Sequence, residues 1–157
     1  MTYRIAGLDP AQFAPLWSMA DDELARRRAR RVVADSDTGH PCRVSLEEAR
    51  RGERLLLVNH VSNDVDAPYR SAFAIFVRED AAEAAVFEDR CPPLLDGRTL
   101  SLRGFDAEGA LADSRLAAPG AADATIRALL ADPRIAYINA HNAAAGCFAA
   151  RIERDGQ

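Results

Sequence analysis

The sequence contains no lysine, so all 20 of its Lys-plus-Arg residues are arginines. This absence excludes chemistries that depend on a lysine amine, including Schiff-base and pyridoxal catalysis, the Walker phosphate loop and the kinase-type phosphate lysine. We expect no cofactor.

Cysteine is also scarce. The three cysteines stand at positions 42, 91 and 147, an odd number without a C-x-x-C pair, which argues against a disulfide framework. Free thiols suit a reducing cytosol, so we predict a cytoplasmic protein. No stretch approaches the roughly 18 consecutive apolar residues of a membrane span, and residues 1–10 lack the pattern of a signal peptide. We therefore expect no membrane partner.

Aromatic residues make up only 6% of the chain, and its net charge is −4. One basic cluster, Arg26–Arg31, follows the acidic run Asp21–Glu23. Acids at the first turn and cations at the last turn match the dipole of a helix. Nucleic-acid binding would need a wider basic surface with aromatics between the charges, so we expect no nucleic-acid partner.

The 32 alanines nearly equal the 35 Leu, Ile, Val and Phe residues together, which predicts a thin core. No linker or repeat divides the chain, so we expect a single domain over residues 1–157. Capping and spacing signals predict helices that start at Asp9-Pro10, at Ser18 and at Ser45, a helix over Ala81–Phe87, and one from Ala122 to before Pro133. Apolar runs predict strands over Arg31–Ala34, Cys42–Leu46, Arg54–His60, Ala72–Arg78, Leu100–Phe105, Ala110–Leu116, Arg134–His141 and Cys147–Glu153.

Short connections between successive strands make those pairs antiparallel. The turn 106–109 is typical of a hairpin. The sequence therefore predicts an α+β fold, in which several short helices pack on a mainly antiparallel β-sheet.

Alternating residues in the last two predicted strands divide into two faces. One face carries the apolar set Ala136, Ile138, Ala140, Phe148, Ala150 and Ile152. Pairing apolar with apolar residues places His141, Asn139 and Cys147 together on the other face. A histidine beside a cysteine can activate the thiol, and Asn139 would orient the imidazole or contact a ligand. The ordinary alternative is that both residues are structural core groups.

The loop Gly39-His40-Pro41-Cys42-Arg43, the segments 68–70 and 74–79, and the ending Gly146-Cys147-Phe148-Ala149 form a distinctive set. On these motifs the chain, from Tyr3 to Arg154, resembles an uncharacterised bacterial family, the domain of unknown function DUF1203. The resemblance implies a bacterial single-domain protein and implies no particular reaction or ligand.

Arg43 and Arg70 are candidates for bidentate binding of a carboxylate or phosphate, helped by the Tyr69 hydroxyl. The alternative is that each arginine pairs with one of the 24 acidic residues. A zinc site is also conceivable, because His40, Cys42, His60, His141 and Cys147 supply enough ligands. His-x-Cys is not a common zinc spacing, however, and we expect no metal.

Three hypotheses follow. The first is a small-molecule binding domain that holds an anion through Arg43, Tyr69 and Arg70. The second is a thiol-dependent enzyme with Cys147 or Cys42 as nucleophile and His141 as base. The third is an assembly domain that forms a homodimer and has no chemical site. The first needs only correct placement of the side chains, so we favour it.

Overall fold

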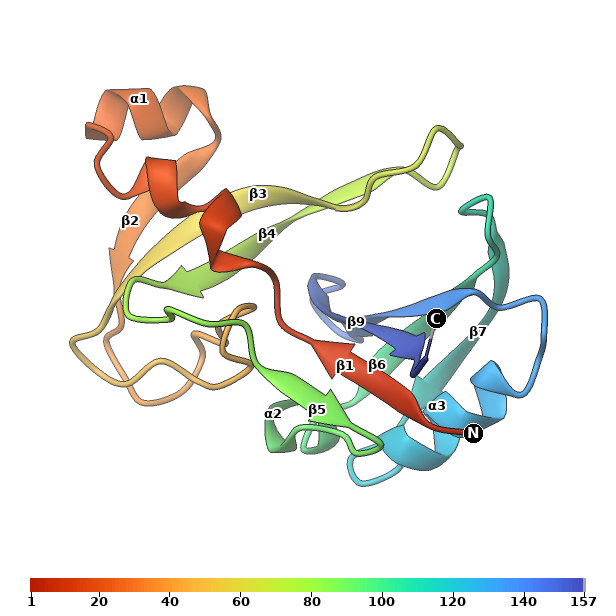
Figure 1. Cartoon of the computed structure of the whole chain (residues 1–157). Helices are drawn as coiled ribbons and strands as arrows, with labels where there is room; N and C mark the ends of the chain where they lie inside the picture. Colours follow the sequence, from red (N-terminus) through yellow and green to blue (C-terminus); the bar gives the residue numbers. More distant parts are fainter. Residues whose placement is uncertain (157) are drawn as a thin grey trace.

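Two antiparallel sheets dominate the computed structural model, which describes residues 1–156 (Figure 1). The larger sheet has the order β5 (Val86–Glu88), β1 (Tyr3–Ala6), β9 (Phe148–Arg154), β8 (Tyr137–Asn142), β6 (Leu100–Phe105) and β7 (Leu111–Ala117). The smaller sheet has the order β2 (Ala29–Val33), β3 (Arg54–Asn63) and β4 (Ser71–Arg78). All pairs of these strands are antiparallel, which confirms the predicted α+β class.

The helices are short. They are η1 (Pro10–Gln12), η2 (Ala14–Leu16), α1 (Asp21–Arg26), α2 (Pro93–Asp96) and α3 (Ala122–Leu130). The longest, α3, buries Ile126, Leu129 and Leu130 against the larger sheet, as their spacing predicts. None of the helices in residues 1–156 combines the length and apolar character that crossing a membrane requires.

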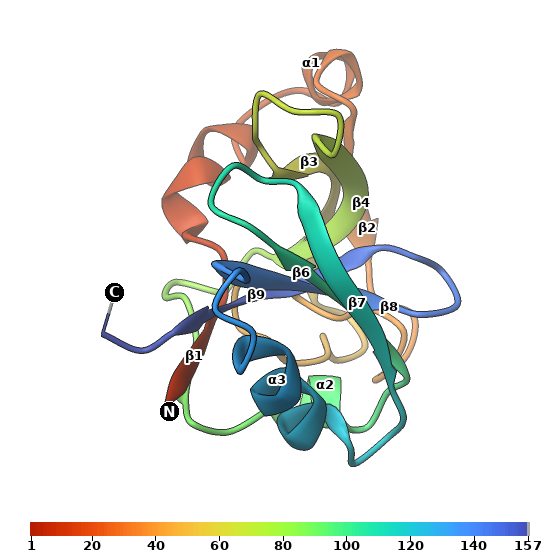
Figure 2. The same cartoon turned by 90° about the vertical axis from the view of Figure 1, so that its right-hand side faces the viewer.

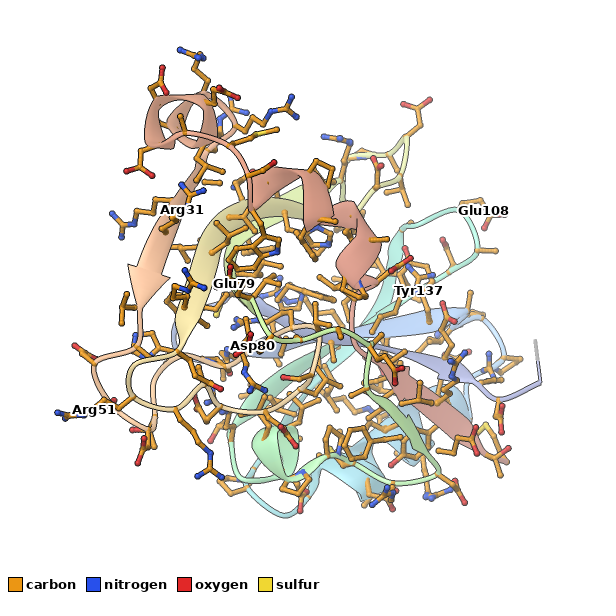
Figure 3. All side chains as sticks on the ribbon, turned by 60° about the vertical axis from the view of Figure 1, so that its left-hand side comes forward. Arg31, Arg51, Glu79, Asp80, Glu108 and Tyr137 are labelled. Atoms are coloured by element: carbon orange, nitrogen blue, oxygen red, sulfur yellow. The ribbon has the colours of Figure 1, made fainter. Side chains whose placement is uncertain are left out.

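Strand β8 is covered on both faces. Below it in Figure 2 lie α2 and α3, and above it lies the β3–β4 hairpin. The first core therefore joins Ile138, Ala140 and Ile152 to α3, whereas the second joins Phe148 to residues of the smaller sheet such as Ile75. Tyr137 lies within the body of the molecule, and its hydroxyl donates a 2.6 Å hydrogen bond to Asn63 Oδ1 on β3 (Figure 3).

A β-bulge interrupts the β8–β9 hairpin near its end. Ile138 faces Ile152 and Ala140 faces Ala150, in the expected register, but His141 then pairs with Phe148. The extra residue turns Phe148 away from the expected apolar set and into the core between the sheets. The parity argument that placed Cys147 on the face of His141 is therefore wrong at this end of the hairpin.

Two of the expected helices do not form in the described chain, one at Ser45 and one over Ala81–Phe87. The Ser45 segment forms turns, and its expected capping acid, Glu48, bonds instead to the His40 amide and the Arg98 guanidinium. The expected helix over Ala81–Phe87 is replaced by a loop and by β5, which pairs with β1. The expected strand over Cys42–Leu46 makes one isolated bridge in the described chain, between Cys42 and Phe76.

Candidate functional site

Arg43 leaves a loop whose backbone is held on two sides. Its N–H donates to the Phe76 carbonyl on β4 at 3.0 Å, and its carbonyl accepts from the Leu8 N–H at 2.8 Å. The side chain therefore starts from a fixed point between the two sheets.

A pocket of about 440 Å³ opens beside this side chain. We call it the Arg43 pocket. Its polar lining consists of Arg43, Arg98, Thr99, Asn142 and Cys147, and its remaining lining residues are Gly39, Pro41, Ala74, Phe76 and Ala143–Ala145. A ligand with a polar head and an apolar body matches such a lining.

The Arg43 guanidinium is buried, with only 3% of the residue exposed. Its Nε donates to the Phe148 carbonyl at 2.8 Å, Nη1 to the Pro41 carbonyl at 2.6 Å, and Nη2 to the Cys147 sulfur at 3.4 Å. A guanidinium has five N–H donors. One donor on each terminal nitrogen therefore remains outside these three bonds.

No carboxylate compensates this charge within residues 1–156, because none of the ion pairs there includes Arg43. Burial lowers the pKa of Arg43, and the neighbouring Cys147 partly offsets this effect. A buried cation without a counter-ion is costly, so an anion in the pocket would relieve an existing penalty.

A second arginine, Arg98, lines the pocket near Arg43. Arg98 donates through Nη1 to Asn142 Oδ1 at 3.2 Å and through Nη2 to Glu48. The Asn142 amide then has its Nδ2 directed at the Cys147 sulfur, 3.1 Å away. These polar residues form the charged wall of the pocket, and because Glu48 balances Arg98, this wall retains one net positive charge, that of Arg43.

Cys42, the other candidate nucleophile, is fully buried. Its sulfur accepts the backbone N–H groups of Val44, Ser45 and Arg78 at 3.3 to 3.4 Å. These bonds hold the loop that carries Arg43, which gives Cys42 a structural setting next to the pocket.

Tyr69 and Arg70 do not line the Arg43 pocket. They lie in the connection between β3 and β4, where Arg70 Nε pairs with Asp64 at 3.1 Å and Tyr69 packs edge-on against Phe105. The Arg70 side chain is 56% exposed, so its ion pair is a surface interaction.

His141 is buried, and the partners of its imidazole are groups other than the thiol. Its Nδ1 lies 2.9 Å from the Gly146 carbonyl, and its ring packs against Phe73 and Phe148. Since a carbonyl only accepts, Nδ1 carries the proton. Burial lowers the pKa of His141 to about 4. No hydrogen bond within residues 1–156 joins this imidazole to Cys147, whose partners there are Arg43 and Asn142.

Asn139 is also separate from the pocket. It is 1% exposed, it lies between Arg103 and Arg151 on the neighbouring strands, and neither atom of its side-chain amide has a hydrogen-bond partner in residues 1–156. Within the same residues, no group of three or more His, Cys, Asp or Glu side chains is arranged to hold a metal ion.

Sequence reasoning missed Arg98, Thr99 and Asn142. Arg98 and Thr99 precede β6, and Asn142 ends β8. The Thr99 carbonyl accepts the Ala143 N–H at 3.1 Å, which joins the two segments. The sequence did offer signals for these residues: Arg98 and Thr99 stand directly before a predicted strand, and Asn142 directly follows His141. Only the pairing of β6 with β8 brings them together.

A family model described as a protein of unknown function, DUF1203, matches residues 39–154. The chain belongs to this family. The DUF1203 match begins at Gly39, at the start of the loop that carries Arg43, and includes all of the pocket-lining residues. Comparison with curated proteins gave no match. Comparison with solved structures gave none either.

Proposed function

We propose that this DUF1203 protein binds a small anion, with a carboxylate or phosphate head, in the Arg43 pocket. The observation that carries the proposal is the buried Arg43 guanidinium, which has donors to spare and no carboxylate partner in the described chain. A guanidinium fork suits both oxyanions. The single net charge of the wall favours a carboxylate over a phosphate, because a carboxylate carries one negative charge at neutral pH.

The lining of the pocket favours a ligand whose body is apolar. Phe76, Pro41 and the alanines of the β8–β9 loop supply apolar surface around the charged wall. An aromatic carboxylate such as benzoate combines both features, and it is the probe of choice. Inorganic phosphate tests the charged head alone.

Ala144 offers a sharp test, because it lines the pocket and is exposed. Ala144→Glu adds a negative charge to the wall, and Ala144→Gln adds a side chain of the same size without charge. We expect the Glu variant to bind benzoate about tenfold more weakly than the wild type, which corresponds to about 1.4 kcal/mol. We expect the Gln variant to stay within about threefold of the wild type, a difference below 1 kcal/mol.

Isothermal titration calorimetry measures these affinities, and neutral benzamide is the matched control ligand. A wild-type dissociation constant of about 1 mM or lower for benzoate or phosphate, with none measurable for benzamide, supports the proposal. Equal binding of benzoate by the Glu and Gln variants, or no binding of either anion by the wild type, contradicts it.

The thiol-dependent alternative receives less support, since His141 has the Gly146 carbonyl as partner and is not among the pocket-lining residues. The assembly alternative needs one contiguous apolar patch. The exposed large hydrophobic residues instead lie on several elements, with Val33 on β2, Val86 on β5 and Leu116 on β7.

The proposed setting is the bacterial cytoplasm, because three free cysteines suit a reducing compartment. Fractionation of a bacterium that expresses the tagged protein tests this placement.

A further inference from the structure

The Cys147 sulfur stands at the charged wall of the Arg43 pocket. It accepts one hydrogen bond from the Arg43 guanidinium at 3.4 Å and a second from Asn142 Nδ2 at 3.1 Å. The residue is half-buried and lines the pocket. The pocket gives a small reagent access to this sulfur, and the guanidinium and the amide can stabilise a negative charge that a reaction forms there.

The second donor is held in place by a chain of contacts. An asparagine amide can flip, and flipping would present an oxygen to the sulfur. Here Asn142 Oδ1 accepts from Arg98, which is itself paired with Glu48. The other oxygen of Glu48 accepts the His40 N–H at 2.9 Å. This chain of contacts keeps Nδ2 on the sulfur side.

The other two cysteines lack this combination. Cys42 is fully buried and bonded to backbone N–H groups. Cys91 packs against the first core, and burial raises the pKa of its thiol to about 12. A thiol with such a pKa carries almost no negative charge at neutral pH, so it is a poor nucleophile.

We propose that Cys147 is a site of oxidation by hydroperoxides, and that its sulfenate occupies the positive wall of the Arg43 pocket in place of the bound anion. The regulatory half of this inference rests on the proposed function. The oxidation site itself rests only on the environment of the sulfur.

The reaction with hydrogen peroxide is a two-electron oxidation. The Cys147 thiol gives up its proton as its sulfur attacks one peroxide oxygen, an S–O bond forms, and the O–O bond breaks. The sulfur gives up two electrons, and the leaving hydroxide becomes water by taking the proton of the thiol. The neutral sulfenic acid then releases its own proton to the solvent and becomes the sulfenate, so the site gains one negative charge. The new oxygen carries the negative charge close to Arg43 and Asn142, which donate to the sulfur before the reaction.

Charge balance makes oxidation and ligand binding compete. Arg43 provides the only net positive charge of the wall, and one anion neutralises it. A sulfenate is covalently attached, so its negative charge stays beside Arg43. The wall then has no net charge and the pocket is smaller, and an external anion binds more weakly. Reduction of the sulfenate by a thiol such as dithiothreitol regenerates the Cys147 thiol and leaves Arg43 free to bind an external anion.

The experiment exposes the reduced protein to hydrogen peroxide with dimedone present, which traps sulfenic acid, and quantifies each cysteine-containing peptide by mass spectrometry. We expect Cys147 to be labelled at least about tenfold faster than Cys42 or Cys91, because of the three cysteines it combines access from the pocket with a neighbouring guanidinium. Cys147→Ser is the control for label assignment. Equal labelling of Cys91 and Cys147, or an intramolecular disulfide in place of the labelled thiol, overturns the proposal.

Asn142→Asp tests the environment, because it replaces the amide donor with a carboxylate beside the sulfur. We expect labelling of Cys147 to slow by about tenfold, since a like charge opposes the negative charge that the sulfur carries as it attacks the peroxide. Asn59→Asp is the matched control on the exposed part of β3, and it should leave the rate unchanged. If Asn142→Asp does not fold, Ala144→Glu replaces it and should also slow labelling. An unchanged rate in the folded variant contradicts the role assigned to the wall.

Calorimetry with benzoate tests the regulation. We expect oxidation to weaken benzoate binding at least about tenfold, or 1.4 kcal/mol, and dithiothreitol to restore it. Selective labelling of Cys147 without benzoate or phosphate binding by the reduced protein overturns the proposed function and supports the oxidation site. If the reduced protein binds benzoate or phosphate but its three cysteines are labelled equally, the proposed function is supported and the oxidation site is overturned.

Discussion

Arg43 connects the stability of the fold to the chemistry of the pocket. Its guanidinium bridges the Pro41 carbonyl on its own loop and the Phe148 carbonyl on β9, while its second terminal nitrogen, Nη2, contacts the Cys147 sulfur. Two of these bonds are structural, so the charge is held rigidly where a ligand would meet it. An arginine placed in this way loses little conformational entropy on binding an anion.

Replacing Arg43 by Met tests the structural part of this role. The variant removes a buried charge but leaves two buried carbonyls without their donors, and we expect it to lower the free energy of unfolding by about 3 kcal/mol. Arg70→Met is the matched control, because it removes an exposed ion pair and should change stability by less than about 0.5 kcal/mol. Urea unfolding followed by circular dichroism measures both. Equal stability of the two variants would show that the Arg43 bonds contribute nothing beyond surface pairing.

Of the residues proposed from sequence for the site, Arg43 and Cys147 lie together in the pocket. The loop glycine and proline around Arg43 gave a local signal for a shaped segment. By residue type Arg70 was an equally good candidate for binding an anion, yet Asp64 pairs with it on the surface. Residue type alone cannot separate these two arginines, because the difference lies in what the folded chain packs around each.

Elements with strong local signals could be predicted, and elements that depend on distant partners could not. Helix α3 follows its apolar spacing, and β6 has the expected bounds, Leu100–Phe105. Strand β5 forms because β1, some 80 residues earlier, offers it an edge. The Ser45 capping box fails for a similar reason, since Glu48 bonds to Arg98, which is 50 residues away. Such tertiary contacts override local propensity.

The junction after β1 depends on a glycine. A Cβ on Gly7 would lie 1.9 Å from the Val44 carbonyl oxygen, inside the loop that carries Arg43. We expect Gly7→Ala to lower the free energy of unfolding by about 2–3 kcal/mol through overpacking. At Gly97 the Cβ would make an ordinary 3.4 Å contact, and φ is −78°, so Gly97→Ala is the matched control with little expected effect. A Gly7→Ala protein as stable as wild type in urea would contradict the close approach.

At the scale of the whole molecule, the two sheets meet across a core that contains two neutral histidines. His60 on β3 and His141 on β8 both pack against Phe148, at ring separations of 6.2 and 5.9 Å. Burial lowers the pKa of both, and for His141 the Arg103 charge adds to the effect. The alternation of residues in the last hairpin indicated a mixed face for His141, but nothing local indicated that a second sheet covers that face. Protonating either ring puts a charge between the sheets.

This arrangement predicts an acid-sensitive sheet interface. The pKa of His141 is about 4 in the folded protein and about 6.5 in the unfolded chain. Between these values the unfolded state binds more protons, so stability falls as pH decreases through this window. For His141 alone, we expect a loss of about 2 kcal/mol in the free energy of unfolding between pH 7 and pH 5.

Urea unfolding at the two pH values measures this loss, and His141→Gln separates it from other groups. The variant keeps a polar side chain but cannot titrate, so its stability should fall by about 2 kcal/mol less than that of wild type over the same interval. The pH dependence of stability that remains in the variant belongs largely to His60. The carboxyls with lowered pKa values, such as Glu53 and Asp123, lose their contribution to stability only at lower pH. A wild type and a variant that lose equal stability between pH 7 and pH 5 would show that the imidazole of His141 gains a proton as easily inside the fold as outside it. The packing of the smaller sheet over β8 would then be looser than these contacts imply.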